Sequence, residues 1–219
     1  MKYFKTKITD FTGLSSKIDG AIRNSYFIGT KSVNNEIAHL TEKNIIDKRE
    51  ALLLFRKGYA GKRNSVLYFA LKNNIDHLIF FDDDEYPLAV TMTKDKCIWS
   101  GQHVLLTHLN YITDSDITHG HHCGYISPIP YIEFNDVLSE SDFRLFIEAI
   151  SNDILNWNKI KEVMQNGGVT YADKNVLITG EAEEVPEINN AKFISGANLC
   201  ISLKNPQKVK PFYNPVSVK

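Results

Sequence analysis

The chain has 219 residues with 25 basic and 26 acidic side chains, and this near-neutral balance argues against a protein that gains its affinity from nucleic-acid phosphates. Cys97, Cys123 and Cys200 lie far apart without a C-x-x-C spacing, which argues against a disulfide framework or a zinc ribbon and favours the reducing cytoplasm. No run of 18 apolar residues and no signal-peptide core are present, so neither a transmembrane segment nor export is predicted.

The first part of the chain is predicted to form helices that lead into a buried strand. Residues 32–55 have a charged helical pattern in two pieces, and Asp47 and Glu50 have the spacing of a capping box before the second piece. Residues 65–74 carry apolar side chains at helical spacing. The apolar run IDHLIFF then reads as a buried strand, and a helix leading into such a strand is typical of α/β proteins.

The second part is predicted to mix short strands with one long helix. LAVTM and CIWSG read as strands, residues 103–112 fit either a short helix or a strand, and residues 113–130 read as a structured loop rich in His, Gly and Pro. Ser139 and Asp142 open the helix SDFRLFIEAISNDILNW. Its predicted buried face contains Phe143, Phe146, Ile147, Ile150 and Ile154. GGVTYA, NVLIT and AKFISGANLCISL are further predicted strands.

The stretch FFDDDEYP, residues 80–87, places four acidic side chains directly after the buried strand. Because side chains alternate along an extended chain, Asp82 and Asp84 are predicted on one side, and Asp83 and Glu85 on the other. Two carboxylates at the end of a strand form an oxygen-rich pocket suited to Mg²⁺ or Mn²⁺, and a bound cation would relieve their repulsion. The alternative is a solvated acidic turn that simply ends the strand.

The segment GYAGKRNSVLYFALKNNIDHLIFFDDDEYP, together with FISGANLCISL, resembles the nucleotide-sugar glycosyltransferases of the GT-A fold, in particular their family 2-like branch. In that family a G-x-x-x-R-N segment opens a helix, the next strand ends in a D-x-D motif, and a G-x-N strand lines the acceptor side. The resemblance covers residues 58–203 in outline. It implies a mixed, mainly parallel central sheet flanked by helices, related to the Rossmann fold, in a single domain over residues 1–219.

The resemblance also implies a set of site residues. Nucleotide-sugar binding is expected from Gly61, Lys62, Arg63, Asn64, Asp82 and Asp83. A Mn²⁺ or Mg²⁺ ion is expected at Asp82 and Asp84, with Asp84 in direct contact and Asp82 nearer the ribose. The donor or acceptor pocket is expected to contain Trp99, His119, His121, Gly196 and Asn198. A helix N-terminus at the basic segment suits an anionic diphosphate, although an exposed basic turn is the alternative there.

Two departures from the family affect the predicted catalysis. The family's first strand, which supplies much of the nucleotide pocket, is unclear here, and residues 25–30 are a weak candidate for it. In addition, no acidic E-D pair follows Asn198 to supply a general base. Either the base lies elsewhere, or the chain lacks its C-terminal acceptor and base region. The loop before the G-x-N strand offers the carboxylates Asp173, Glu181, Glu183 and Glu184, and none is singled out. The catalytic base is therefore left unassigned.

The histidines and Trp99 have competing interpretations. The loop DITHGHHCGYISPIP could bind zinc, contact the diphosphate or the acceptor, or fold over the sheet with hydrogen-bonded histidines. His103 and His108 are expected to belong to the scaffold. Trp99 is either a platform for a sugar ring or a core tryptophan.

These features predict an enzyme, a metal-dependent glycosyltransferase acting on an unidentified acceptor hydroxyl of a saccharide, a lipid-linked sugar or a protein. The alternatives are a nucleotidyltransferase and a non-catalytic remnant that binds a nucleotide-sugar but lacks the general base.

Overall fold

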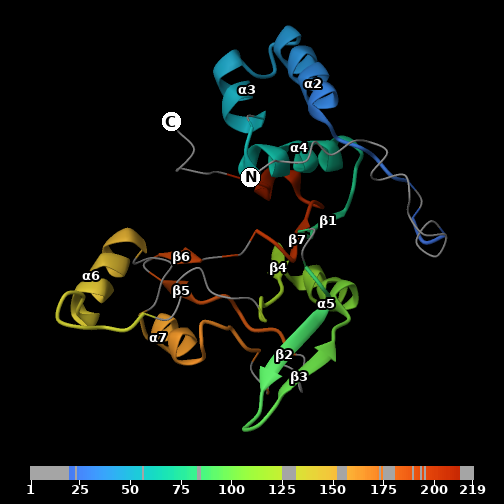
Figure 1. Ribbon diagram of the computed structural model, residues 1–219. Coiled ribbons are helices and arrows are strands. Elements are labelled where there is room, and N and C mark those ends of the chain that lie inside the picture. Colours follow the sequence, from blue (N-terminus) through green and yellow to red (C-terminus); the bar gives the residue numbers. More distant parts are fainter. Residues whose placement is uncertain are drawn as a thin grey trace. The chain divides into compact units, whose positions relative to one another are not determined.

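The computed structural model describes residues 20–22, 24–55, 57–82, 85–124, 132–151, 157–172, 174, 181–188, 190–192, 194 and 196–212 (Figure 1). The chain divides into two compact units. The first contains Met1–Ile75 and Asn205–Lys219, and the second contains Asp76–Lys204.

The first unit is helical. Its helices are α2 (Thr30–Glu42), α3 (Lys48–Phe55) and α4 (Tyr59–Lys72), followed after the second unit by a short 3₁₀ turn, Pro206–Lys208. The two helices predicted over residues 32–55 are confirmed as α2 and α3. The capping box is confirmed too, because Asp47 N–H donates to Glu50 Oε2 (2.8 Å) and Glu50 N–H donates to Asp47 Oδ1 (2.7 Å).

Helix α4 begins earlier than the apolar spacing predicts. It starts at Tyr59 directly after Gly58, whose φ of 126° turns the chain into the helix, and it stops before Asn74, which adopts φ 53°. The helix therefore includes the basic segment that the sequence analysis places ahead of it. Residues 25–29 form no strand, and α2 begins at Thr30.

A polar cluster joins α2 to α4. Glu36 on α2 accepts hydrogen bonds from the Tyr68 hydroxyl (2.9 Å) and from Lys72 Nζ (2.6 Å) on α4. Close to this cluster in sequence, Leu40, Leu67 and Ala70 are buried. The two hydrogen bonds of Glu36 therefore tie α2 to α4.

The second unit contains small antiparallel sheets. Strands β1 (His77–Phe80), β7 (Leu199–Ser202) and β4 (Ile117–His119) form a sheet in the order β1-β7-β4. Strands β2 (Leu88–Met92) and β3 (Cys97–Gly101) form a hairpin, and β5 (Glu187–Ile188) pairs with β6 (Ala191–Lys192).

The predicted mixed, mainly parallel central sheet is wrong. Every strand pair among the described residues is antiparallel, in sheets of three, two and two strands. The continuous apolar run before the acidic residues suggested a strand covered on both faces, as in parallel sheets. Instead only Phe80 of β1 is buried and its other residues are half-buried. Hydrophobicity predicted the strand, but not the direction of the distant strand that pairs with it.

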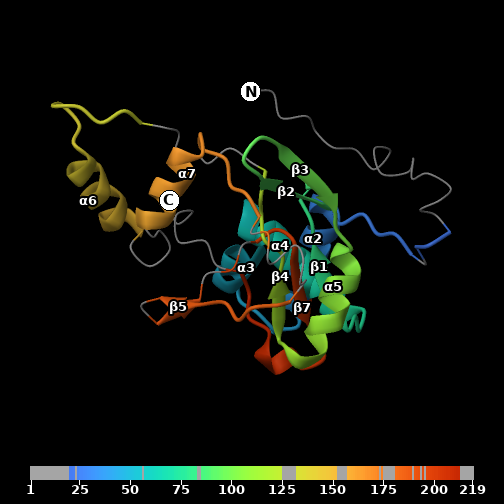
Figure 2. The same ribbon diagram turned by 90° about the horizontal axis from the view of Figure 1, so that it is seen from below.

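Residues 103–112, which fit either a helix or a strand by their sequence, contain helix α5 (Val104–Tyr111). This helix continues into a 3₁₀ turn, Ile112–Asp114. Helix α5 contacts β4, and Figure 2 shows α5 next to the β1-β7-β4 sheet. The predicted strands LAVTM and CIWSG are confirmed as β2 and β3 with these bounds. The predicted strand AKFISGANLCISL is divided into β6 and β7, because Asn198 adopts φ 47° immediately before β7. The predicted strand NVLIT lies outside the described residues.

Helices α6 (Glu140–Ser151) and α7 (Trp157–Gln165) pack on each other. Ser139 caps α6 by accepting a hydrogen bond from Asp142 N–H (3.1 Å), as predicted. Their core consists of Ile147, Trp157, Ile160 and Met164, with Ile132, Phe134 and Phe143 packed against it. The placement of Phe146 on the buried face is wrong, because that side chain is 59% exposed.

Candidate functional site

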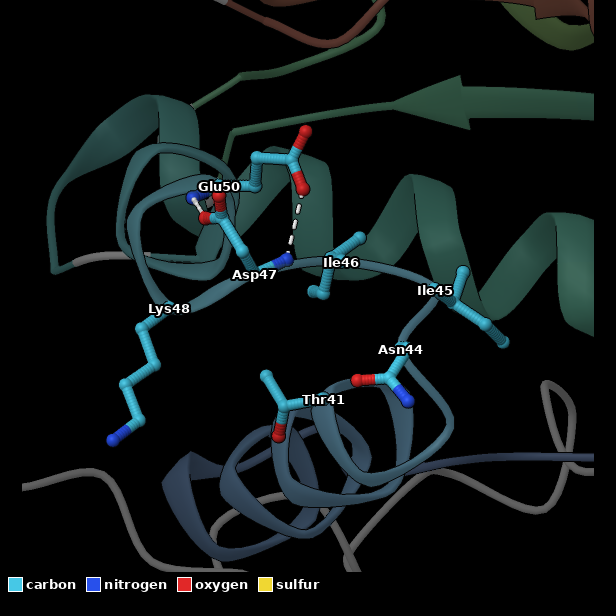
Figure 3. A pocket seen from close by; sticks show the side chains of 7 residues that line it. All are labelled: Thr41, Asn44, Ile45, Ile46, Asp47, Lys48 and Glu50. Carbon is cyan, nitrogen blue, oxygen red and sulfur yellow. Dashed lines mark hydrogen bonds between the residues drawn. The ribbon is translucent and has the colours of Figure 1, made fainter.

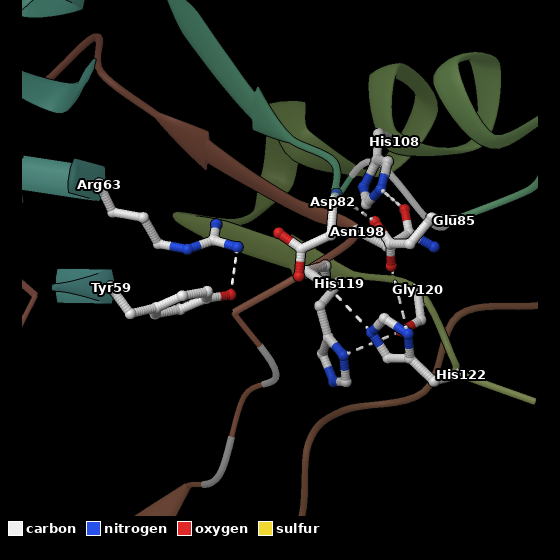
Figure 4. A network of polar contacts seen from close by, with 10 residues as sticks. Tyr59, Arg63, Asp82, Glu85, His108, His119, Gly120, His122 and Asn198 are labelled. Atoms are coloured by element: carbon white, nitrogen blue, oxygen red, sulfur yellow. Dashed lines mark hydrogen bonds and ion pairs between the residues drawn. The ribbon is translucent and has the colours of Figure 1, made fainter. Parts of the chain in front are cut away.

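Three segments that are far apart in sequence meet at one edge of the β1-β7-β4 sheet. Strand β1 ends at Phe80, two residues before Asp82, and β4 ends at His119. Strand β7 begins at Leu199, which pairs with both Phe80 and His119. The acidic run, the histidine loop and the G-x-N segment therefore adjoin the same edge, as Figure 4 shows for Asp82, His119 and Asn198.

Asn198 is held in one orientation at this edge. Its backbone oxygen accepts a hydrogen bond from Gly120 N–H (2.8 Å), and its side-chain Oδ1 lies 2.9 Å from His108 Nε2. Its Nδ2 packs so closely on Gly120 that a Cβ on that glycine would lie only 1.8 Å away. A side chain at position 120 would therefore force the Asn198 amide out of the direction in which His108 holds it (Figure 4).

His108 is the buried support of Asn198, although the sequence analysis places it in the scaffold without a role. It projects from α5, is 5% exposed, and has Nδ1 2.8 Å from Thr118 Oγ1. An amide oxygen only accepts, so Nε2 carries the ring proton and donates to Asn198, while Nδ1 accepts from the Thr118 hydroxyl. No motif links His108 to Asn198, so only the fold could reveal this pair.

His122 joins the histidine loop to both other segments. Its Nε2 lies 3.1 Å from Ala197 O, and its Nδ1 lies 3.3 Å from Glu85 Oε1. The second oxygen of Glu85 accepts a hydrogen bond from Asp82 N–H (2.8 Å). Both partners of His122 are acceptors, so both are satisfied when both ring nitrogens carry a proton. Glu85 is thereby committed to positioning the acidic run and the loop.

His119 has one ring nitrogen in a hydrogen bond, with Nδ1 3.2 Å from Gly120 O. Burial lowers the pKa of His119, the hydrogen bond to Gly120 O opposes this, and the neighbouring rings of His122 and His108 lower the pKa further by electrostatic repulsion. The side chain is half-buried. His119 is therefore a neutral imidazole at neutral pH, with the proton on Nδ1 because a carbonyl oxygen only accepts.

Trp99 lies at the far end of the histidine loop. A Cβ on Gly124, which has φ 76°, would lie 3.5 Å from Trp99 Cη2 and 2.9 Å from Val90 Cγ1. Val90 N–H also donates to Cys123 Sγ (3.4 Å), which anchors the hairpin to the loop. Trp99 is 61% exposed, so the alternative of a core tryptophan is wrong. Its ring is accessible on the hairpin beside the loop.

The acidic run is described in part. Asp82 and Glu85 are placed, whereas Asp83 and Asp84 lie outside the described residues, as does the predicted alternation between Asp82 and Asp84. Within the described ranges, no group of three or more His, Cys, Asp or Glu side chains could hold a metal ion, and this includes the histidine loop up to residue 124. The chemistry of the run still fits Mg²⁺ or Mn²⁺, because a metal that bridges substrate phosphates needs only one or two carboxylates.

The basic segment predicted to bind the nucleotide belongs to the first unit. Gly61, Arg63 and Asn64 are buried within the first turns of α4, whereas Lys62 is exposed. Arg63 Cζ lies 4.3 Å from the centre of the Tyr59 ring, and Arg63 also donates a hydrogen bond to the Tyr59 hydroxyl (Figure 4).

Asn64 connects three parts of that unit. Its Nδ2 donates to Leu54 O and to Phe212 O (3.0 Å each), and its Oδ1 accepts from Phe212 N–H (2.6 Å). These bonds use the whole amide to hold the end of α3 and the C-terminal segment on α4. A role of Asn64 in nucleotide binding stays a prediction.

Of the remaining predicted site residues, Gly196 is half-buried in the turn before Asn198, and His121 is exposed on the histidine loop. Of the carboxylates considered as a base, Glu184 pairs with Lys192, and Asp173 lies outside the described residues.

A hollow of about 400 Å³ lies at the turn between α2 and α3 (Figure 3). Its lining residues are Thr41, Asn44, Ile45, Ile46, Asp47, Lys48 and Glu50. The carboxylates of Asp47 and Glu50 are already used in the capping box, and Thr41 Oγ1 donates to Ile37 O (2.8 Å). The hollow therefore offers a ligand little chemistry compared with the sheet edge.

Comparisons with protein-family models, curated proteins and solved structures find no match to this chain. Within its described part, no helix is both long and apolar enough to span a membrane.

Proposed function

We propose that this protein transfers a sugar from a nucleotide-sugar donor to an acceptor hydroxyl, with a Mn²⁺ or Mg²⁺ ion at the acidic run. One observation carries the proposal: the end of β1 before Asp82 and the start of β7 after Asn198 are paired neighbours, through Phe80 and Leu199. These two segments are the ones that carry the resemblance to glycosyltransferases. A single ligand at this edge could contact both.

The residues at the edge have complementary roles in this proposal. Asp82 and Asp84 would hold the metal, whose charge neutralises the diphosphate leaving group. The Asn198 amide, fixed by His108 and Gly120, would present Nδ2 as a hydrogen-bond donor to a sugar or acceptor hydroxyl. Trp99, exposed beside the loop, offers an apolar face to a sugar ring. The three free cysteines of the chain suit a reducing compartment such as the cytoplasm.

The test is isothermal titration of the chain with UDP, GDP and their sugar derivatives, first with Mn²⁺ and then with EDTA. We expect one nucleotide to bind in the presence of metal only. Asp82→Asn and Asp84→Asn should abolish this binding, whereas Asp95→Asn, at an exposed position between β2 and β3, should not change it. Equal binding by all four proteins would overturn the metal assignment.

Turnover separates the proposed enzyme from its alternatives. Release of free nucleoside diphosphate from the bound donor supports glycosyl transfer, with water as the simplest acceptor. Metal-dependent binding without release on any acceptor would identify a non-catalytic binding protein. Pyrophosphate release from a nucleoside triphosphate and a sugar phosphate would instead identify a nucleotidyltransferase.

A further inference from the structure

Sugar transfer requires a group that takes a proton from the acceptor hydroxyl, and no motif in the sequence identifies it. At the sheet edge, most titratable side chains of the described residues already make hydrogen bonds or ion pairs with other groups of the protein. His108 uses both ring nitrogens, with Thr118 and Asn198 as partners. His122 does the same with Ala197 and Glu85, and Glu85 uses both of its oxygens. The ring nitrogens of the two histidines and the carboxylate oxygens of Glu85 therefore each have a partner already.

His119 differs from the other histidines of this network. Its Nδ1 is bonded to Gly120 O, and within the described part of the chain Nε2 makes no hydrogen bond. The bond at Nδ1 fixes the proton there, so Nε2 carries the lone pair. His119 also ends β4 opposite Leu199, which follows Asn198 directly. The lone pair is therefore held on the strand next to the segment expected to line the acceptor side.

The surroundings keep this ring neutral. Burial lowers the pKa of His119, and repulsion from the rings of His122 in the loop and His108 on α5 lowers it further. The carboxylates of Glu85 and Asp82 adjoin the same edge, but Glu85 is paired with His122. A neutral imidazole at neutral pH is the form that can accept a proton.

We propose that His119 is the general base of the transfer, acting through Nε2 on the acceptor hydroxyl. This assignment rests on the proposed function. As the acceptor oxygen forms its bond to the anomeric carbon, its proton passes to Nε2. The bond from that carbon to the diphosphate oxygen breaks, and the nucleoside diphosphate leaves with the electron pair. The imidazolium at His119 then returns its proton to solvent.

The experiment compares the parent protein with His119→Gln. The matched control is His103→Gln, because His103 is exposed and its described hydrogen bond is made by its backbone oxygen, which accepts from Thr107 Oγ1. Metal-dependent nucleotide affinity and diphosphate release are measured for each protein from pH 5 to pH 9. We expect His119→Gln to keep its affinity but lose about 10²–10⁴-fold in kcat, as is usual for a lost general base. The parent should show an inflection in kcat/KM below the ordinary histidine pKa of about 6.5, which the variant lacks.

A measurement on the parent alone covers the case in which the variant does not fold. Long-range ¹⁵N–¹³C correlation spectra of histidine-labelled protein report the tautomer of each ring. A neutral His119 with the proton on Nδ1 at pH 7.5 is expected, and a proton on Nε2 would overturn the assignment. Unchanged kcat in a folded His119→Gln variant would overturn it as well.

The two proposals fail in different ways. If the parent neither binds nor hydrolyses any nucleotide-sugar, the proposed function fails and this assignment fails with it. If the parent releases diphosphate and His119→Gln matches it at every pH, the proposed function stands and only the base is wrong.

Discussion

His108 on α5 and Asn198 before β7 are joined by a 2.9 Å hydrogen bond between Nε2 and Oδ1, although 90 positions separate them in the sequence. This bond ties α5 to the edge of the sheet that the acidic run and the histidine loop also adjoin. The direction of the Asn198 amide thus depends on a side chain that no motif in the sequence indicates.

Replacing His108 should destabilise the fold. His108→Leu leaves Thr118 Oγ1 and Asn198 Oδ1 without their partner in a buried place, which we expect to lower the free energy of unfolding by about 1–3 kcal/mol. Urea unfolding followed by circular dichroism measures this. His103→Leu, at an exposed position, should stay within about 0.5 kcal/mol of the parent. Equal losses in the two variants would mean that the buried bonds add nothing to stability.

A side chain at position 120 should displace the Asn198 amide. In Gly120→Ala the new Cβ would lie 1.8 Å from Asn198 Nδ2 and 2.5 Å from Cγ, so the amide must move. We expect a loss of about 1–3 kcal/mol in stability, as for overpacked sites, together with weaker nucleotide binding.

Gly101→Ala is the matched control for this substitution, because a Cβ there meets nothing within 4 Å. It should leave both stability and binding close to those of the parent. A Gly120→Ala variant that behaves like Gly101→Ala would show that Asn198 is not held as the structure places it.

Tyr68 should make stability fall at alkaline pH. Burial, with the hydrogen bond to Glu36, raises the pKa of Tyr68 from 10.0 to about 12. Its contribution to stability is fully present below pH 10 and is lost as the pH rises from about 10 through 12, because the unfolded chain ionises first. Comparing urea midpoints at pH 9 and pH 11 for the parent and Tyr68→Phe tests this, and the variant should lose less stability over the interval. An equal loss would exclude a raised pKa at Tyr68.

The capping box should contribute measurably to α3. Asp47→Ala removes the acceptor for Glu50 N–H, which we expect to cost about 0.5–2 kcal/mol, whereas Asp47→Asn should keep most of the cap. Asp95→Ala removes an exposed carboxylate at a turn and serves as the control for lost charge. Thermal unfolding of the three variants gives the comparison. If Asp47→Asn and Asp47→Ala are equally destabilised, charge and not capping explains the loss.

Short-range patterns in the sequence predicted several local elements of this protein correctly. The capping box at Asp47 and Glu50, the cap of α6 at Ser139, and the strands LAVTM and CIWSG are all found where their residues predict them. Each depends on side chains within a few residues of one another. Helix caps and the alternation of apolar side chains act over such short distances, so a linear pattern carries them.

The pairing of the strands and the surroundings of the candidate site depend on contacts between distant parts of the second unit. Strand β1 was predicted from its apolar side chains, but its antiparallel partner β7 comes from the other end of the second unit. Where β1, β4 and β7 meet, His108 supports Asn198 and His122 pairs with Glu85. His119 there has a hydrogen bond at Nδ1 and, among the described residues, none at Nε2. Burial patterns record how much of a strand is covered, but not which distant segment covers it, and therefore a linear pattern could not place these contacts.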